Sequence, residues 1–189
     1  MQDVADAVGI LKGSLYYYIN SKEDLLFRML LEVHEDAKGI VTETAILDLP
    51  PLERLRTYVR RHVVYNARNL AKIAVYYHDF RLLTPTRKQA ILEHRKFYEN
   101  VRGLITEAQE RGELDPRIDV SIASNAIFGM MNWIYTWYRL GGKVTPEYLG
   151  DLYAEIAVSG ITGQQMPEPT AAPKPRGSSR TKGRPPFHG

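Results

Sequence analysis

The sequence has no cysteine among its 189 residues, so neither a disulfide framework nor a cysteine-ligated metal site can form. It also has no apolar run close to the roughly 18 residues that indicate a membrane-spanning helix. The first residues include Asp3 and Asp6 and lack the apolar segment of a signal peptide. These absences predict a protein of the reducing cytoplasm with no membrane partner.

The patterns that usually mark catalytic sites are missing as well. The five histidines, at positions 34, 62, 78, 94 and 188, show neither HxxxH nor HxxE spacing, which would place two metal ligands on one helix face. There is no G-x-S-x-G sequence, and no strand-like alternation that a phosphate loop could follow. We therefore expect no enzyme activity, no metal and no other cofactor.

The net charge of +3 is unevenly distributed along the chain. Residues 164–189 hold five basic residues against a single acid, which leaves −1 for residues 1–163. This tail is rich in Pro, Gly, Ser and Thr, so it cannot bury enough apolar surface to offset the entropy of ordering. We predict a disordered basic tail. The simpler interpretation is a solubilising extension, and the alternative is an auxiliary contact to a nucleic-acid backbone.

The first 25 residues carry the most informative pattern. Val4, Ala5 and Val8 recur at helical spacing, and Gly9 then permits a tight turn in the left-handed conformation. Residues 12–18 can form a short second helix. Two short helices joined by such a turn form a helix-turn-helix, which lays its second helix in the major groove of DNA.

A domain of this kind needs a preceding helix that covers the Val4 and Val8 face, and the sequence begins inside the first helix of the motif. We therefore expect part of the DNA-binding domain to lie outside this sequence. Residues 1–24 carry a net charge of −2, whereas phosphate neutralisation provides most nucleic-acid affinity. The missing segment is expected to supply part of the positive charge.

The motif resembles the TetR family of bacterial repressors, whose pattern is roughly I-A-x-x-A-G-V-x-x-G-x-L-Y-x-H-F-x-x-K-x-x-L. The match is ungapped and includes Val4, Ala5, Val8, Gly9, Ile10, Gly13, Leu15, Tyr16, Tyr17, Lys22 and Leu25. Tyr18 and Ile19 replace the usual His and Phe, and Leu11 occupies a commonly polar position. The resemblance implies an all-α fold, with a partial helix-turn-helix domain over residues 1–20 and a helical ligand-binding and dimerisation domain over residues 21–163.

Helical periodicity continues beyond the motif. Residues 21–24 form a capping box that opens a helix, and the prolines at 50 and 51 end it. Further helices are predicted over residues 52–70, 70–83, 85–108, 119–140 and 146–161.

The helix predicted over residues 119–140 is apolar on more than one face, which implies burial on two sides. A thick monomeric core would explain this pattern. The family resemblance instead implies a two-fold four-helix interface, which would hold two recognition helices one DNA turn apart. We favour a homodimer whose interface includes Ile127, Met131, Ile134, Leu152 and Ile156.

Polar and aromatic side chains gather on three of the predicted helices. An apolar cavity with a few polar anchors is what a small-molecule site needs, and the candidate lining residues are Tyr58, His62, Tyr65, Asn66, Tyr77, Arg81 and Asn132. Aromatic residues at helical spacing are, however, more often core than pocket. The W-x-x-x-W-Y-R-x-G-G segment at residues 133–142 is similar to a TetR branch that senses acyl-CoA esters in lipid and sterol catabolism, which implies an apolar or thioester effector.

Taken together, these features predict a ligand-responsive, homodimeric repressor that binds a palindromic operator in double-stranded DNA. Ser14 and Tyr17 are the candidates for base contacts, within a DNA-contacting set of Lys12, Gly13, Ser14, Tyr16, Tyr17, Tyr18 and Lys22. A small-molecule effector would favour a dimer whose recognition helices are wrongly spaced for the operator. The alternative is a helical small-molecule-binding dimer that has lost DNA binding through N-terminal truncation.

Overall fold

The computed structural model describes residues 1–93 and 97–163, and every regular element within them is a helix. The chain order is α1 (Gln2–Ala7), α2 (Lys12–Tyr18), α3 (Lys22–Ala45), α4 (Pro51–Arg68), α5 (Leu70–Asp79), η1 (Phe80–Leu82), α6 (Pro85–Glu93), α7 (Phe97–Glu110), α8 (Val120–Asn132), α9 (Ile134–Trp137) and α10 (Pro146–Thr162). The all-α fold class is confirmed. The tail predicted over residues 164–189 lies outside the described residues.

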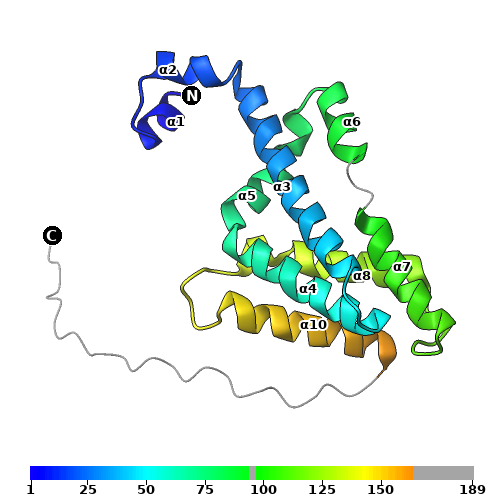
Figure 1. The fold of residues 1–189 in the computed structure, drawn as a ribbon. Coiled ribbons are helices and arrows are strands. Elements are labelled where there is room, and N and C mark those ends of the chain that lie inside the picture. Colours follow the sequence, from blue (N-terminus) through cyan, green and yellow to red (C-terminus); the bar gives the residue numbers. More distant parts are fainter. Residues whose placement is uncertain (94–96, 164–189) are drawn as a thin grey trace, which may run out of the picture.

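Helices α1 and α2 form a small unit at one end of the molecule, from which α3 runs into the main helical body (Figure 1). Gly9 has a φ of +70°, the left-handed conformation in which the chain turns between α1 and α2. The apolar cluster of this unit is small: Ala5 and Ile19 are buried, with Met1, Val4 and Leu25 partly buried against them. The local signals of the sequence therefore fold into the predicted helix–turn–helix layout.

Helix α3 begins where the capping box predicts. The Ser21 hydroxyl oxygen accepts a hydrogen bond from the backbone N–H of Asp24 at 3.0 Å. The helix then continues for 24 residues, a length of about 36 Å. One straight element thus connects the N-terminal unit with the interior of the body (Figure 1).

Helix α4 lies at the centre of the main body, with α3, α7, α8 and α10 packed against it (Figure 1). Helix α10 approaches closely because Gly150 has no side chain: a Cβ there would lie 2.9 Å from the Arg60 carbonyl oxygen and from Val64 Cγ2. The core around α4 includes Leu55, Val59, Val63, Ile105, Met131 and Leu149. A second cluster joins α3, α5 and α6 through Leu30, Ile73, Leu83 and Ile91.

Two of the predicted helices are divided in the structure. The helix expected over residues 119–140 turns at Trp133, whose carbonyl oxygen accepts from the Thr136 hydroxyl at 2.7 Å. Tyr138 then leaves the helix, because its buried side chain donates a hydrogen bond to the Val144 carbonyl at 2.7 Å. The helix expected over 70–83 ends at Asp79 and continues as η1, and that expected over 85–108 corresponds to α6 and α7.

No helix among the described residues combines the length and the apolar character needed to cross a bilayer.

Candidate functional site

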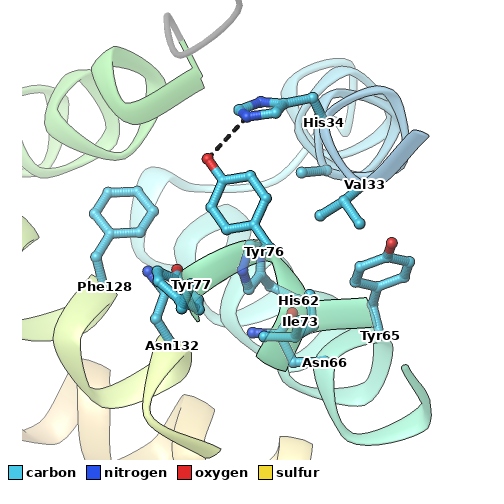
Figure 2. A pocket seen from close by; sticks show the side chains of 11 residues that line it. Val33, His34, His62, Tyr65, Asn66, Ile73, Tyr76, Tyr77, Phe128 and Asn132 are labelled. Atoms are coloured by element: carbon cyan, nitrogen blue, oxygen red, sulfur yellow. Dashed lines mark hydrogen bonds between the residues drawn. The ribbon is translucent and has the colours of Figure 1, made fainter. Parts of the chain in front are cut away.

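A cavity lies inside the helical body, between α3, α4, α5 and α8 (Figure 2). Its volume is about 30 Å³, which holds a water molecule but is roughly a tenth of the smallest usual ligand pockets. Its wall consists of Val33, His34, Ala37, His62, Tyr65, Asn66, Ile73, Tyr76, Tyr77, Phe128 and Asn132. This small aromatic cavity must expand before it can hold a ligand.

Five of the seven predicted ligand residues belong to this wall: His62, Tyr65, Asn66, Tyr77 and Asn132. Tyr58 is buried directly behind it, with its hydroxyl 3.3 Å from His62 Nδ1. Arg81 is exposed and is not part of the wall. Arg81 lies apart from the wall because α5 ends at Asp79 and the tighter η1 turn does not continue the face that carries Tyr77, and its contact with a ligand stays a prediction.

The α3 side of the cavity was missed by the sequence analysis. Val33, His34 and Ala37 line the cavity from α3. Tyr76 on α5 points toward His34 (Figure 2). Their spacing is that of any core-facing helical stripe, so it gave no sign of a cavity. A histidine within an apolar stripe was the available signal.

Two hydrogen bonds connect the four helices around the cavity, each bond joining one pair of helices. His34 Nε2 and the Tyr76 hydroxyl lie 2.9 Å apart, and both side chains are buried (Figure 2). Asn66 Nδ2 donates to the Met131 carbonyl oxygen at 3.1 Å. The first bond connects α3 to α5, and the second connects α4 to α8.

His62 is the buried titratable group at the centre of this wall. Burial disfavours the imidazolium and lowers the pKa of His62 to about 4, although a hydrogen bond with Asn132 opposes the shift. His62 is therefore neutral at neutral pH. None of the lining residues is Asp, Glu, Lys or Arg. The cavity can thus hydrogen-bond an uncharged polar group, but it offers no counter-charge to an ionised one.

The N-terminal end of α3 is fastened to the start of α6. Arg87 Nη2 lies 3.0 Å from Asp24 Oδ1, and its guanidinium stands 5.0 Å from the centre of the Phe27 ring. The Glu23 carboxylate accepts a hydrogen bond from the Thr84 backbone N–H at 2.8 Å, and this bond lowers the pKa of Glu23. The end of α3 nearest to α2 is therefore tied to the segment that follows α5.

The candidate DNA-contacting residues lie together on α2 and at the start of α3. All of them are exposed: Lys12, Gly13, Ser14, Tyr16, Tyr17, Tyr18 and Lys22. Tyr17 is 86% exposed, and its ring meets that of Tyr18 edge-on at 5.4 Å. Figure 1 shows α2 at the outer end of the molecule. A large aromatic side chain held this far into solvent is available to a partner.

An apolar surface runs along the outer side of α8 and α9. Ile122 is 70% exposed and Trp133 is 62% exposed, an unusual position for side chains of this size. Between and beyond them lie exposed Ala126, Gly129 and Trp137. These five residues are called the α8–α9 surface below.

None of the five predicted interface residues belongs to this surface. Ile127, Met131 and Ile134 are at most 3% exposed within the single chain. Within the single chain they point into the core around α4, and their place in a dimer interface stays a prediction. Ile156 on α10 is 38% exposed, and Leu152 is half-buried. The outward face of α8 is offset from the predicted one.

The helical body matches a family model described as the tetracycline repressor-like C-terminal domain, over residues 48–161. The HTH-type transcriptional repressor KstR2 of Mycobacterium tuberculosis is 29% identical over 169 residues, which cover 86% of this chain and 82% of that protein. The fatty acid metabolism regulator protein of Bacillus subtilis is 28% identical over 170 residues, which cover 84% and 82%.

Solved structures share the arrangement of helices. The ketosteroid transcriptional regulator KstR2 of M. tuberculosis superposes with a TM-score of 0.79 at 27% identity, covering 85% of this chain and 83% of that one. AibR, solved in complex with isovaleryl coenzyme A and operator DNA, gives a TM-score of 0.71 at 25% identity, covering 85% of each chain.

Proposed function

The chain belongs to the TetR family of transcriptional regulators, and from that premise we propose that it is a repressor released from its operator by a small apolar effector. In this proposal residues 1–20 bind DNA, and residues 21–163 hold the effector and the dimer interface. The repressor acts as a homodimer on a palindromic operator, because two recognition helices must meet two half-sites. Acting on chromosomal DNA, it works in the cytoplasm.

The cavity between α3, α4, α5 and α8 supports an effector with an apolar body. Its wall is rich in aromatic side chains, and its polar groups are neutral amides, hydroxyls and imidazoles. A thioester or other uncharged carbonyl fits these groups. An acyl-CoA ester is the class we propose, since AibR is solved with isovaleryl coenzyme A and a second relative is a fatty acid metabolism regulator.

The observation that carries the mechanism is the bond between His34 and Tyr76. A ligand cannot enter a cavity of about 30 Å³ without moving side chains of its wall. Tyr76 lies on α5 and His34 on α3, so expansion here changes how α3 sits against α5. A ligand shifts a conformational equilibrium only as far as it binds one conformation more tightly than the other. Here the ligand favours the conformation with the expanded cavity.

In this proposal the N-terminal end of α3 transmits the change from His34, near the middle of the helix, to the DNA-binding residues 1–20. Lys22 is the first residue of α3, and the neighbouring Glu23 and Asp24 hold Thr84 and Arg87 of the segment after α5. A movement of α5 therefore acts on the N-terminal end of α3 in two ways. One is the bond between Tyr76 and His34, and the other is the contacts of Glu23 and Asp24 with the segment after α5. In a dimer, the result is a changed separation between the two copies of α2.

The experiment is an operator titration with the full chain. A site is first selected from a pool of random duplexes, and its affinity is then measured with octanoyl-CoA, isovaleryl-CoA, palmitoyl-CoA or free coenzyme A present. We expect at least one acyl ester to weaken operator binding tenfold or more and free coenzyme A to have no effect, because the acyl part fills the cavity.

Two outcomes contradict the proposal. If the chain selects a duplex but no acyl ester changes its affinity for that duplex, then acyl-CoA esters are not its effectors. Binding of an acyl ester without any affinity for duplex DNA would favour a helical ligand-binding dimer that does not act on DNA.

A further inference from the structure

The orientation of the N-terminal unit, formed by α1 and α2, is held against the body by few side chains. Among the described residues, α3 contributes a single side chain, Leu25, to the apolar cluster of this unit. The junction between α2 and α3 spans residues 19–21, and Asn20 and Ser21 in it are exposed. Because so small an apolar contact does not fix an angle, the polar contacts at the junction determine how the unit sits on α3.

Asp24, in the first turn of α3, is the buried charge at this junction. It is 6% exposed, and both of its carboxylate oxygens have partners. Oδ1 accepts a hydrogen bond from Arg87 Nη2 of α6 at 3.0 Å. Oδ2 accepts from the backbone N–H of Asn20 at 3.4 Å and lies 3.0 Å from Arg28 Nη2. A single carboxylate thus connects the junction that follows α2 to a residue 63 positions further along the chain.

The two arginines on Asp24 differ in what their bonds depend on. Arg28 lies four positions further along α3 itself, so its ion pair with Asp24 persists wherever α6 moves. The bond of Arg87 exists only while α6 stays at this end of α3. A buried charge is strongly destabilising when it loses its only partner. Since Asp24 retains Arg28, the bond between α3 and α6 can open without that penalty.

Arg87 can also leave this position without losing all of its partners. Its other contacts at α3 include the Phe27 ring, whose centre lies 5.0 Å from the guanidinium, and Glu23, whose Oε1 lies 3.8 Å from Nη1. The Arg87 side chain is 28% exposed, so water can replace Asp24 around the guanidinium. The contact between Asp24 and Arg87 is therefore one that can open and close.

We propose that Asp24 is a positioning residue that sets which half-site spacing the repressor accepts. While Arg87 holds Asp24, the junction at Asn20 keeps one orientation, and the two copies of α2 in a dimer keep one separation. When Arg87 is removed, the carboxylate is held by α3 alone, and the N-terminal unit adopts a range of orientations. This inference rests on the proposed repressor function, to which it adds a residue that determines operator specificity.

The spacing of the two half-sites is the property of the operator that reports this role. One added base pair between them displaces one half-site by about 3.4 Å along the DNA axis and turns it by about 35° around that axis. A dimer with fixed N-terminal units loses part of its contacts on such a duplex. A dimer with loosely held units loses fewer, because each unit follows its own half-site.

The test compares three duplexes with the full chain: the operator that the chain selects, and versions with one base pair inserted or removed at its centre. We expect the unmutated chain to bind both altered duplexes at least roughly tenfold more weakly than the selected operator, and Arg87→Met to bind them only about threefold more weakly. The ratio between duplexes is the readout, because a changed charge near DNA alters phosphate attraction for all duplexes alike.

Arg28→Met is the matched control. It removes the other arginine from the same carboxylate and leaves Arg87 in place. We expect it to keep the spacing preference of the unmutated chain. Urea denaturation at the assay temperature establishes that each variant is folded.

Asp24→Asn provides a second, independent variant. The asparagine keeps the backbone N–H that Ser21 caps, and its side-chain oxygen still accepts a hydrogen bond, but it has no charge to attract Arg87. It should broaden the spacing preference as Arg87→Met does. The double variant should broaden it no further than either single variant, because both act through one bond. Effects that multiply would mean that the two residues act separately, and they would overturn the proposal.

The proposal is also overturned if the unmutated chain accepts shifted half-sites equally well, if Arg87→Met keeps the full spacing preference, or if Arg28→Met loses it to the same extent. Each of these results leaves the proposed repressor function intact, because operator binding and its release by acyl esters are measured separately. A chain that selects no duplex would contradict the repressor function itself, and this inference would fall with it.

Discussion

The Tyr76 hydroxyl and His34 Nε2 share a buried hydrogen bond of 2.9 Å that joins α5 to α3 across the cavity. The two rings also lie 5.3 Å apart, centre to centre. Because α3 begins at Lys22, directly after α2, this pair connects α5 to the helix that leads to α2.

Tyr76→Phe should weaken this link while preserving the ring. We expect the free energy of unfolding to fall by about 1 kcal/mol, the usual net worth of one hydrogen bond. Operator affinity without effector should be nearly unchanged, and its response to an acyl ester should shrink. Urea denaturation and operator titration measure both effects. Tyr135→Phe is the control, because it keeps the ring stacked on Tyr77 at 5.5 Å. An unchanged effector response in Tyr76→Phe would remove the pair from the mechanism.

A second prediction concerns pH and His62. Burial lowers the pKa of His62 from 6.5 to about 4, so between these values the unfolded chain binds a proton that the folded chain does not. The contribution of His62 to the free energy of unfolding is therefore fully present above pH 6.5 and is lost as pH falls toward 4. At pH 4.5 the loss amounts to about 2–3 kcal/mol relative to pH 7.

His62→Gln should remove this contribution. Carboxylates protonate in both proteins, so the difference between their pH profiles isolates His62 from the other groups. Urea denaturation at pH 7 and pH 4.5 provides the comparison, with His78→Gln as the exposed control. Parallel profiles for the unmutated chain and His62→Gln would mean that His62 is not buried in its neutral form.

The parts of the fold that local chemistry determines were predictable from the sequence. The positive φ of Gly9 and the cap by Ser21 depend on residues within a few positions, and both appear where expected. Five cavity residues on α4, α5 and α8 were found because polar groups stood out on apolar helices. His34 was not, because its role depends on Tyr76, which lies 42 residues away.

The orientation of α8 shows what a sequence pattern could not settle. A helix that is apolar on two sides gives no sign of which side meets the rest of its own chain. Packing against α4 buries Ile127 and Met131, and it leaves Ile122 and Trp133 outside. Helix α8 also ends at Asn132, a break that the continuous apolar run did not reveal.

A third prediction follows for the dimer. Ile122→Asp places a charge on the exposed α8–α9 surface, where it should prevent association without unfolding the chain. Ile127→Asp, by contrast, buries a charge in the core and should destabilise the monomer by several kcal/mol. Sedimentation velocity and circular dichroism separate the two results. A folded dimer of Ile122→Asp would place the interface elsewhere.

A fourth prediction concerns the operator. Lys22→Ala should weaken binding to every duplex and reduce the slope of log affinity against log salt by about 1, as for one lost phosphate contact. Tyr17→Ala should instead change the preference among operator variants, because its exposed side chain is a candidate for base contacts. Arg117→Ala, an 89% exposed side chain between α7 and α8, is the control cation. Equal effects of Lys22→Ala and Arg117→Ala would argue against a phosphate contact at Lys22.

The last prediction concerns the stability of the N-terminal unit. Its buried apolar residues are Ala5 and Ile19, whereas α8 contributes Ala123, Ile127 and Met131 to a large shared core. Segments with few buried contacts open locally at a lower free energy than global unfolding. Amide protons of residues 4–18 should therefore exchange faster than those of residues 123–131, and operator DNA should slow the exchange of the first group selectively. Native-state hydrogen exchange by mass spectrometry resolves both segments. Equal protection of the two segments in the free protein would show that α1 and α2 unfold only together with the rest of the chain. The N-terminal unit would then be rigid before it binds DNA.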